Sequence, residues 1–170
     1  MRLFIAIPLD DEMKRFVRNE QAAFRMAGVR GNYTPQENLH LTLAFIGEFS
    51  DPDLVLEAME TVEFSPMTLT MDRMGRFDDL WWMGFAESFE LNALVKRLRR
   101  ALAEAGIPYD RKRFSPHVTI LRRSDIPPRA SLPQPQIGSR QMTADRIVLY
   151  CSTRGKGGMI YTELGSVEAL

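Results

Sequence analysis

The stretches NLHLTLAFIGE, residues 38–48, and RFSPHVTILRR, residues 113–123, carry the two histidines of this 170-residue chain. In each stretch the histidine is followed by an apolar residue, a threonine and a second apolar residue. Apolar side chains alternate with other side chains around both histidines, and this period of two predicts a β-strand with one buried face. The fold is therefore expected to contain two similar strands, each carrying one histidine.

Residues two apart on a strand point to the same side, so His40 is predicted to project beside Thr42, and His117 beside Thr119. A histidine on a strand often does no more than form a hydrogen bond within the core, and for each histidine alone this interpretation stays open. With nine threonines and 45% apolar residues in the chain, the pattern follows a given histidine by chance about one time in a hundred. Its repetition favours a shared site.

Two facing imidazoles suit acid–base chemistry, because with ordinary pKa values near 6.5 one can hold a proton while the other accepts one. Threonine hydroxyls are short, uncharged donors that can hold the oxygens of a phosphate. This set of groups predicts phosphodiester chemistry without a metal or another cofactor. A metal site is the alternative, but it needs a third ligand, and neither strand carries Asp or Glu at a neighbouring position on the same face.

Hydrophobic periodicity and terminator residues predict three helices and seven strands along the chain. The helices are expected over residues 10–28, 50–63 and 88–106. The strands are expected over residues 3–8, 38–47, 67–77, 80–87, 113–123, 144–153 and 159–166. Residues 29–37, the Pro-rich residues 125–136 and the Gly-rich residues 154–158 read as loops or turns. Strands interleaved with helices in this order indicate an α+β or mixed α/β domain.

Composition limits the class of protein. The chain has one cysteine, which fits a reducing compartment, and the expected location is cytoplasmic. Its formal net charge of zero indicates that the chain as a whole is not a general polyanion binder. The apolar run of residues 3–8 is too short for a signal core or a membrane span and is expected to form a buried strand. Residues 96–123 hold nine basic and two acidic residues, which predicts salt-sensitive contact with a few phosphates rather than an extended RNA-binding surface. The default expectation is a monomer that does not bind membranes.

The two histidine stretches resemble the paired signature of the two-histidine phosphoesterase superfamily, and are most similar to the RNA 2′,3′-cyclic phosphodiesterases, first named 2′-5′ RNA ligases. RLFIAIPLD (residues 2–10) is similar to the opening strand of that family, and IVLYCST (residues 147–153) with MIYTEL (residues 159–164) is similar to its closing hairpin. The resemblance implies an α+β fold in which residues 1–170 form one bilobal domain. Two pseudo-symmetric antiparallel-sheet lobes with outer helices would enclose a central cleft.

The resemblance also implies a reaction, the hydrolysis of 2′,3′-cyclic phosphate ends of RNA or nucleotides to 2′-phosphates. His40 would protonate the departing 3′ oxygen and His117 would activate water, although the pseudo-symmetry makes the reverse assignment equally sensible chemically. Thr42 and Thr119 would hold the phosphate. Arg122 matches an arginine that follows the second motif in this family and could add positive charge there.

Further nucleotide contacts are expected from residues near the two motifs. Tyr33 and Phe114 are candidates for stacking on a base, and Lys112 and Arg113 for contact with backbone phosphates, or alternatively for ordinary surface charge. The aromatic residues at 77, 81 and 82 are expected in the core. The alternative functions are 2′-5′ ligation or 2′-5′ phosphodiester cleavage at the same site, and a non-catalytic module that recognises RNA ends. If the chain were such a module, replacing either histidine would leave its affinity and its function nearly unchanged.

Overall fold

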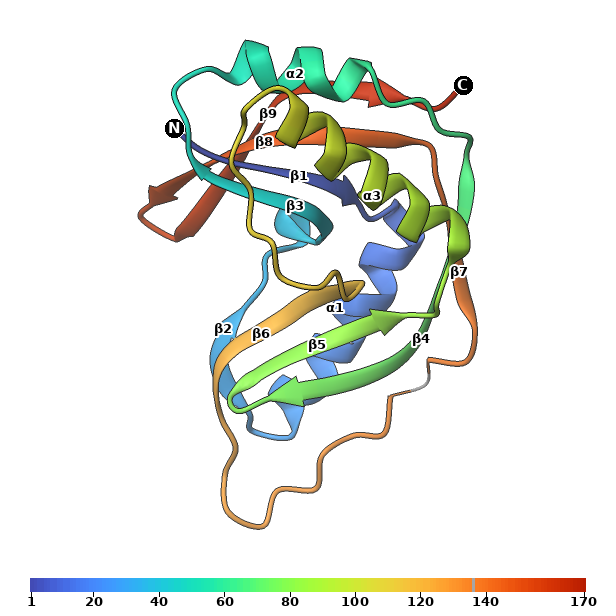
Figure 1. The fold of residues 1–170 in the computed structure, drawn as a ribbon. Helices are drawn as coiled ribbons and strands as arrows, with labels where there is room; N and C mark the ends of the chain where they lie inside the picture. The colour runs from blue at the N-terminus through green and yellow to red at the C-terminus, as the bar shows by residue number, and fades with distance from the viewer. Residues whose placement is uncertain (136) are drawn as a thin grey trace.

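Two antiparallel sheets form the frame of the molecule in the computed structural model, which describes residues 1–135 and 137–170 (Figure 1). The first sheet has the strand order β3 (His40–Glu48), β1 (Arg2–Pro8), β8 (Arg146–Gly155) and β9 (Gly158–Glu168). The second has the order β2 (Arg30–Tyr33), β6 (His117–Asp125), β5 (Leu80–Phe85), β4 (Met67–Phe77) and β7 (Arg140–Ala144). Each histidine is the first residue of its strand, one in each sheet.

The helices begin where short polar side chains cap them. Helices α1 (Asp11–Met26), α2 (Pro52–Glu60) and α3 (Phe89–Glu104) are preceded by Asp10, Asp51 and Ser88. Each of these side chains accepts a hydrogen bond from the backbone N–H three residues later, which satisfies one of the free donors of the first turn. The three predicted helices are confirmed, with ends within three residues of those expected.

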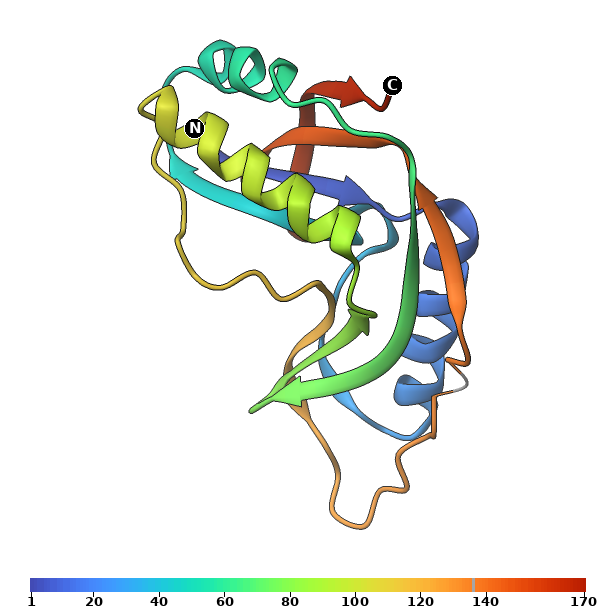
Figure 2. The same ribbon diagram turned by 45° about the vertical axis from the view of Figure 1, so that its right-hand side comes forward.

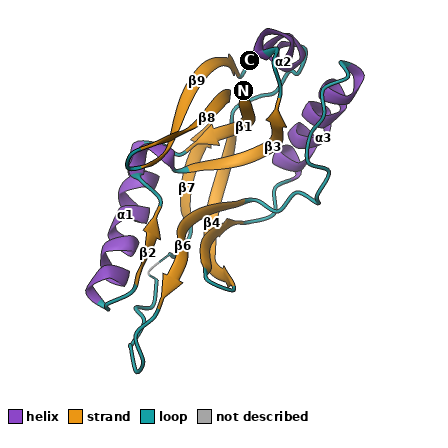
Figure 3. Ribbon diagram, turned by 90° about the vertical axis from the view of Figure 1, so that its left-hand side faces the viewer, coloured by secondary structure: helices purple, strands orange, loops and turns teal. Residues whose placement is uncertain are grey.

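The two 16-residue helices each pack away from the sheet that precedes them. Helix α1 follows β1 of the first sheet but contacts β6 and β7 of the second. Helix α3 follows β5 of the second sheet but contacts β3 of the first, where it also packs on α2. Figures 2 and 3 show α1 alongside the second sheet, with α2 and α3 grouped at the first. Each long helix therefore supports the histidine strand of the other half.

Helix α1 is joined to the second sheet by Gln21, the eleventh residue of the helix and one of the few buried polar side chains. Its Nε2 donates to the backbone oxygen of Thr34 (3.0 Å) and to that of Ile120 in β6 (2.9 Å). A buried amide keeps such a position only when it is hydrogen bonded. Ile120 lies three residues after His117, so the bond holds the histidine strand directly.

Helix α3 makes the equivalent connection through Arg99, which is the eleventh residue of that helix. The guanidinium donates to the backbone oxygen of Lys112 (2.8 Å) and to that of Leu43 in β3 (3.4 Å). Leu43 lies three residues after His40. The two halves therefore use the same position of the helix and the same position of the facing strand, one with a neutral amide and the other with a cation.

The predicted fold class and the two sheet-based lobes are confirmed. The predicted buried strand at residues 3–8 is β1, the inner neighbour of both β3 and β8, with residues 3–7 all less than 5% exposed. The predicted hairpin over residues 67–87 is β4 and β5, and the closing hairpin is β8 and β9, which extend into the predicted Gly-rich turn. The Pro-rich residues 126–135 contain no helix or strand, and Gln136, the end of that predicted loop, lies outside the described residues.

Two strands were not predicted. Residues 30–33 form β2 within the expected loop, and residues 140–144 form β7. Both are edge strands of the second sheet, and most of their side chains are exposed. An edge strand with few buried side chains lacks the alternation on which the prediction relied. No helix in the described part of the chain is long and apolar enough to cross a membrane.

Candidate active site

A cleft of about 940 Å³ lies between the two histidine strands. Strand β3 contributes His40 and Thr42 to its lining, and β6 contributes His117, Thr119 and Arg122. In the strand registers His40 pairs with Pro8 of β1 and His117 with Gly84 of β5. The cleft therefore brings together five of the nine site residues expected from the sequence.

The two imidazoles are oriented by hydrogen bonds of the same type, one for each ring. The Nδ1 of His40 is 2.6 Å from the backbone oxygen of Asn38, and the Nδ1 of His117 is 2.7 Å from that of Ser115. A carbonyl oxygen only accepts, so Nδ1 carries the proton of each neutral ring. The other nitrogen, Nε2, is left with a lone pair on the neutral ring. Both histidines are thus presented in the tautomer that can take or give a proton at Nε2.

Asn38, just before β3, is itself held by β9, the strand at the opposite end of the strand order of the first sheet. It is 6% exposed, and its Nδ2 donates to the backbone oxygen of Met159 in β9 at 2.9 Å. The carbonyl that holds His40 is therefore tied to the β8–β9 hairpin. No residue type in the sequence pattern marks this role, since the contact joins segments 121 residues apart.

His40 is enclosed by aromatic rings. Phe4, Tyr161 and Tyr150 have ring centroids 4.9, 5.3 and 6.3 Å from its own. Burial lowers the pKa of His40 to about 4, against a partly opposing effect of the hydrogen bond to Asn38, and the nearby positive charge of Arg122 lowers it further. His40 is therefore neutral in the free protein at neutral pH, and its Nε2 accepts a hydrogen bond from Thr42 Oγ1 at 3.0 Å.

His117 has a more open setting beside Trp82, whose ring centroid is 6.3 Å away. The tryptophan lies on the same sheet face because it pairs with Thr119 in β6, and its ring covers Gly75 of β4. A Cβ on Gly75 would come within 2.1 Å of that ring, so glycine is required for this close approach. On the outer side, Trp82 contacts Phe77, which is 60% exposed.

The expectation for the aromatic residues at 77, 81 and 82 needs correction. Trp81 is partly buried and packs edge-on against Phe24 of the core at 5.1 Å, which agrees in part with the expectation. Phe77 is exposed and Trp82 is half-buried beside the cleft. The reason is that successive residues of a strand point to opposite faces. Trp81 faces the helix α1 side and Trp82 the cleft side.

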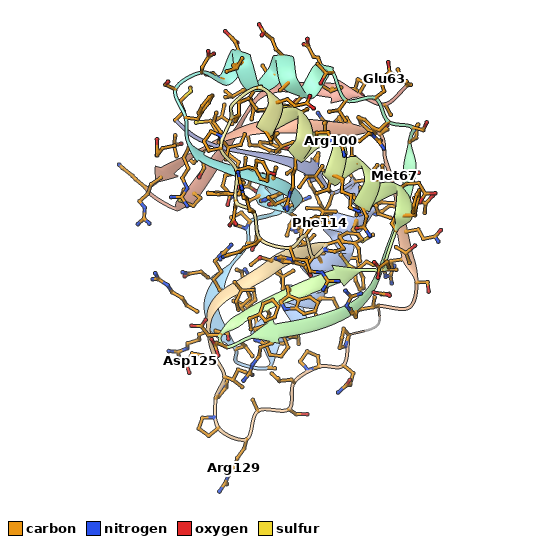
Figure 4. All side chains as sticks on the ribbon, in the orientation of Figure 1. Glu63, Met67, Arg100, Phe114, Asp125 and Arg129 are labelled. Atoms are coloured by element: carbon orange, nitrogen blue, oxygen red, sulfur yellow. The ribbon has the colours of Figure 1, made fainter. Side chains whose placement is uncertain are left out.

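The four expected nucleotide contacts are dispersed. Tyr33 does not line the cleft but two neighbouring cavities. Its hydroxyl donates to the backbone oxygen of Val29 (2.8 Å), and its ring lies under Arg25 (4.1 Å). Phe114, labelled in Figure 4, and Arg113 line a different pocket beside α3. Lys112 is exposed, with its ammonium 4.0 Å from the carboxylate of Asp110. These three residues do not line the cleft, because the segment before β6 runs along α3.

The threonines differ in what they contact. Thr42 donates to His40, as described, whereas the hydroxyl of Thr119 forms no hydrogen bond with the described residues. The backbone oxygen of Thr119 accepts a bond from Thr34 Oγ1 (2.8 Å), which fixes β6 beside the segment that follows β2. Arg122 is exposed at the same wall of the cleft and is positioned to add positive charge there.

The cleft thus presents two Nε2 atoms, two hydroxyls and a guanidinium in one enclosed space. Among the described residues, no group of three or more His, Cys, Asp or Glu side chains is placed to hold a metal ion. The groups that are present can move protons and hold an anion. The sequence pattern did not indicate Phe4, Tyr150 or Tyr161, although the alternation of residues in the closing hairpin offered a weak signal for the tyrosines.

Comparisons with known proteins agree with this geometry. Residues 14–155 match the family model described as the 2′-5′ RNA ligase superfamily. An RNA 2′,3′-cyclic phosphodiesterase of Escherichia coli is 30% identical over 96% of this chain and 93% of its own length. A protein of that name from Geobacillus stearothermophilus is 32% identical over 71% of this chain, which spans 41% of that longer relative. The crystal structure of Escherichia coli LigT complexed with 3′-AMP is similar at a TM-score of 0.83 with 28% identity, covering 99% and 97% of the two chains.

Proposed function

The chain belongs to the 2′-5′ RNA ligase superfamily, and on that premise we propose that it is an enzyme that hydrolyses 2′,3′-cyclic phosphate ends of RNA or nucleotides to 2′-phosphates. The observation that carries the proposal is the matched pair of imidazoles. Each has its Nδ1–H bound to a carbonyl two residues before it and its Nε2 available for proton transfer. A site that only bound a phosphate would need donors but no second proton acceptor.

In the proposed reaction His117 takes a proton from water, and the resulting hydroxide attacks phosphorus. The bond between phosphorus and the 3′ oxygen breaks, His40 gives its proton to that oxygen, and the phosphate stays on the 2′ oxygen. The half-exposed side of the cleft at His117 admits water. The aromatic rings around His40 shield it from solvent, which suits the group that protonates the departing alkoxide. Paired proton transfer of this kind contributes about 10²- to 10⁴-fold per group.

This assignment places a condition on His40. Its pKa of about 4 in the free protein leaves it neutral, so it must gain a proton when the substrate binds. An anionic phosphate against Nε2 favours the charged form and raises that pKa. Binding then releases the Thr42 hydroxyl from Nε2 to donate to a phosphate oxygen. Thr119 and Arg122 are proposed to hold the remaining oxygens as negative charge builds in the transition state.

The proposed reaction uses neither a metal nor another cofactor. The donor set supports this, because the two imidazoles, two hydroxyls and one guanidinium already supply the acid, the base and the anion-binding groups. The proposed substrates are RNA termini or nucleotides, in keeping with the names of the relatives.

The first test measures hydrolysis of a 2′,3′-cyclic nucleotide in excess chelator, for the parent and for His40→Ala and His117→Ala, with identification of the product isomer. The proposal expects a 2′-phosphate from the parent and a loss of at least about 100-fold in each variant. Loss of the parent's activity in chelator would contradict metal independence. A parent that binds the cyclic nucleotide without hydrolysing it would indicate a binding module, and a parent inert on it but active on 2′-5′ linkages would indicate the ligase-type chemistry.

A second substrate assigns the two roles. A cyclic phosphate with sulfur in place of the 3′ bridging oxygen has a leaving group that needs little protonation, because a thiol is far more acidic than an alcohol. With this substrate His40→Ala should recover most of its lost rate, whereas His117→Ala should not. If only the His117→Ala variant recovered its rate, His117 would be the acid and His40 the base.

A further inference from the structure

A second groove, of about 580 Å³, continues from the cleft past Arg122 toward the tip of the β8–β9 hairpin. The two cavities share part of their walls, namely Thr34, Asn38, Arg122, Arg154, Met159 and Tyr161. The groove is lined on one side by residues 32–35, at the end of β2 and just after it, and on the other by residues 154–158 of the hairpin turn. A ligand held in the cleft therefore has a continuous path into this groove.

The groove carries positive charge without opposing carboxylates. Its lining includes Arg122, Arg123, Arg154 and Lys156, and no lining residue is Asp or Glu. In the described part of the chain none of these four cations forms an ion pair with a carboxylate. Net charge is zero for the whole chain, so this gathering of cations is a local property. Such a groove attracts an anion with several charges.

A backbone irregularity in β6 directs two consecutive arginines into the groove. Adjacent residues of a regular strand point to opposite faces, yet Arg122 and Arg123 both line it. The reason is a bulge in the pairing of β2 with β6, where Arg123 has a φ of +53°. A residue other than glycine rarely adopts this backbone conformation. Such a conformation persists where the surrounding structure enforces it, often at functional sites.

The facing strand is built for this bulge. Gly31 of β2 has a φ of +150°, and a Cβ there would come 2.8 Å from the backbone oxygen of Arg122 and 3.0 Å from that of Arg123. The opposite wall is formed by Gly155, Lys156, Gly157 and Gly158, so an extended ligand can approach the backbone closely. The walls therefore combine four cations and three glycines with uncharged polar and aromatic side chains, and they carry no carboxylate.

We propose that this groove binds the RNA strand upstream of the reacting terminus, with Arg123 and Lys156 contacting the phosphate that links the last two nucleotides. The inference rests on the proposed function, because it takes the cyclic phosphate to lie between His40 and His117. It assigns the substrate as the end of a single-stranded oligonucleotide rather than a free mononucleotide. Of the nine basic residues in residues 96–123, Arg122 and Arg123 line the groove, and Arg154 and Lys156 of the hairpin complete its four cations. Four cations are proposed to contact one or two phosphates.

The test compares kcat/KM for a cyclic mononucleotide with that for a dinucleotide ending in a 2′,3′-cyclic phosphate. The parent is expected to prefer the dinucleotide by roughly tenfold or more, which is the usual effect of hydrogen bonds to a charged group. The double variant R123Q/K156Q should lose this preference and keep its rate on the mononucleotide. The matched control K96Q/R100Q removes the same charge from two exposed positions on α3 and should behave like the parent.

A neutral linkage isolates the phosphate contact. Replacing the internal phosphate of the dinucleotide by a methylphosphonate should reduce the parent's preference by the same factor as the double variant, and the two changes together should cost no more than either alone. The dependence of log KM on log salt concentration should be steeper for the phosphate dinucleotide by about 0.7 per contact.

The outcomes separate the two proposals. If the parent hydrolyses both substrates equally well, or if the control variant loses as much preference as R123Q/K156Q, the groove assignment is wrong and the proposed function stands. If a variant loses the mononucleotide rate as well, the two cations act in the cleft and the assignment is again wrong. If neither substrate is hydrolysed, the proposed function fails, and the groove assignment fails with it.

Discussion

The half of the molecule that carries His40 encloses its imidazole with three aromatic rings, whereas the half that carries His117 leaves its imidazole beside one tryptophan at the open side of the cleft. The supports of the two rings are nevertheless alike. Both use the carbonyl two residues earlier, and both strands receive a hydrogen bond from the eleventh residue of the facing helix. The backbone frame is thus repeated, while the side chains around each ring differ, and burial lowers the pKa of His40.

The largest expected effect comes from removing either ring. His40→Ala and His117→Ala should each lower kcat by about 10²- to 10⁴-fold on an ordinary cyclic nucleotide. The double variant should lose little more than the worse single variant, because groups that act as a unit are not additive. Rapid-quench rates on the single and double variants check this, and additive losses would show that the two halves work independently.

The cross-connections between helices and strands should differ in their contribution to stability. Gln21→Leu leaves two carbonyls without the amide and should lower the free energy of unfolding by about 1–3 kcal/mol. Arg99→Met should lower it by about 1 kcal/mol or less, because the buried Nε of Arg99 has no hydrogen-bond partner among the described residues and its removal relieves that cost. Urea unfolding of both variants measures the difference, with Arg100→Met as the exposed control on α3. A larger loss for Arg99→Met would contradict this ranking.

The enclosure of His40 should make stability depend on pH. Its pKa in the folded state is about 4, below the ordinary value of 6.5 that applies in the unfolded chain, so the unfolded state binds more protons between these values. The associated stability is fully present above pH 6.5 and is lost as pH falls toward 4. Between pH 7 and pH 5 the loss should be about 1–2 kcal/mol. His40→Gln should lack this component in urea unfolding, whereas His117→Gln should retain it.

The smallest expected difference is that between the two threonines. Thr42→Val and Thr119→Val keep the shape of the side chain and should each lower kcat/KM by about tenfold, since each removes one donor to the phosphate. Thr42→Val should also raise the pKa of His40, because the neutral ring loses the hydroxyl that donates to its Nε2. Titration of the His40 ring by NMR checks this second effect. An unchanged pKa would show that the Thr42 hydroxyl does not favour the neutral ring.

Several parts of the fold and of the site could be predicted because they depend on local pattern. The three helices follow from amphipathic runs that end at terminator residues, and the His-x-Thr pairs share a face by the geometry of a strand. The edge strands β2 and β7 escaped prediction because neighbouring strands, and not their own side chains, hold them in place. The same limit applies to Asn38 and Tyr161, whose roles depend on contacts between distant segments.

The segment before β6 illustrates a different limit. Proximity in sequence to His117 suggested that Phe114, Arg113 and Lys112 reach the nucleotide, but Arg99 holds the backbone of Lys112 against α3 and directs the segment away from the cleft. Arg123 shows the converse case. A regular strand would place it opposite Arg122, and a single residue with positive φ reverses that expectation. Which basic residues lie near the site therefore depends on tertiary contacts and not on proximity in sequence to His117.

The strand order of the two sheets has a consequence for the order in which the chain can assemble. The second sheet takes its central strands β4, β5 and β6 from the middle of the chain. The first sheet pairs β1 with β8 and thus joins residues 150 positions apart, as with Arg2 and Ser152. During synthesis, the edge of β1 that pairs with β8 stays unpaired until the closing hairpin has been made. Sheets that depend on such distant pairings fold slowly and leave apolar edges exposed in the meantime. The nascent chain is therefore most vulnerable to aggregation after β3 has emerged and before β8 has been made.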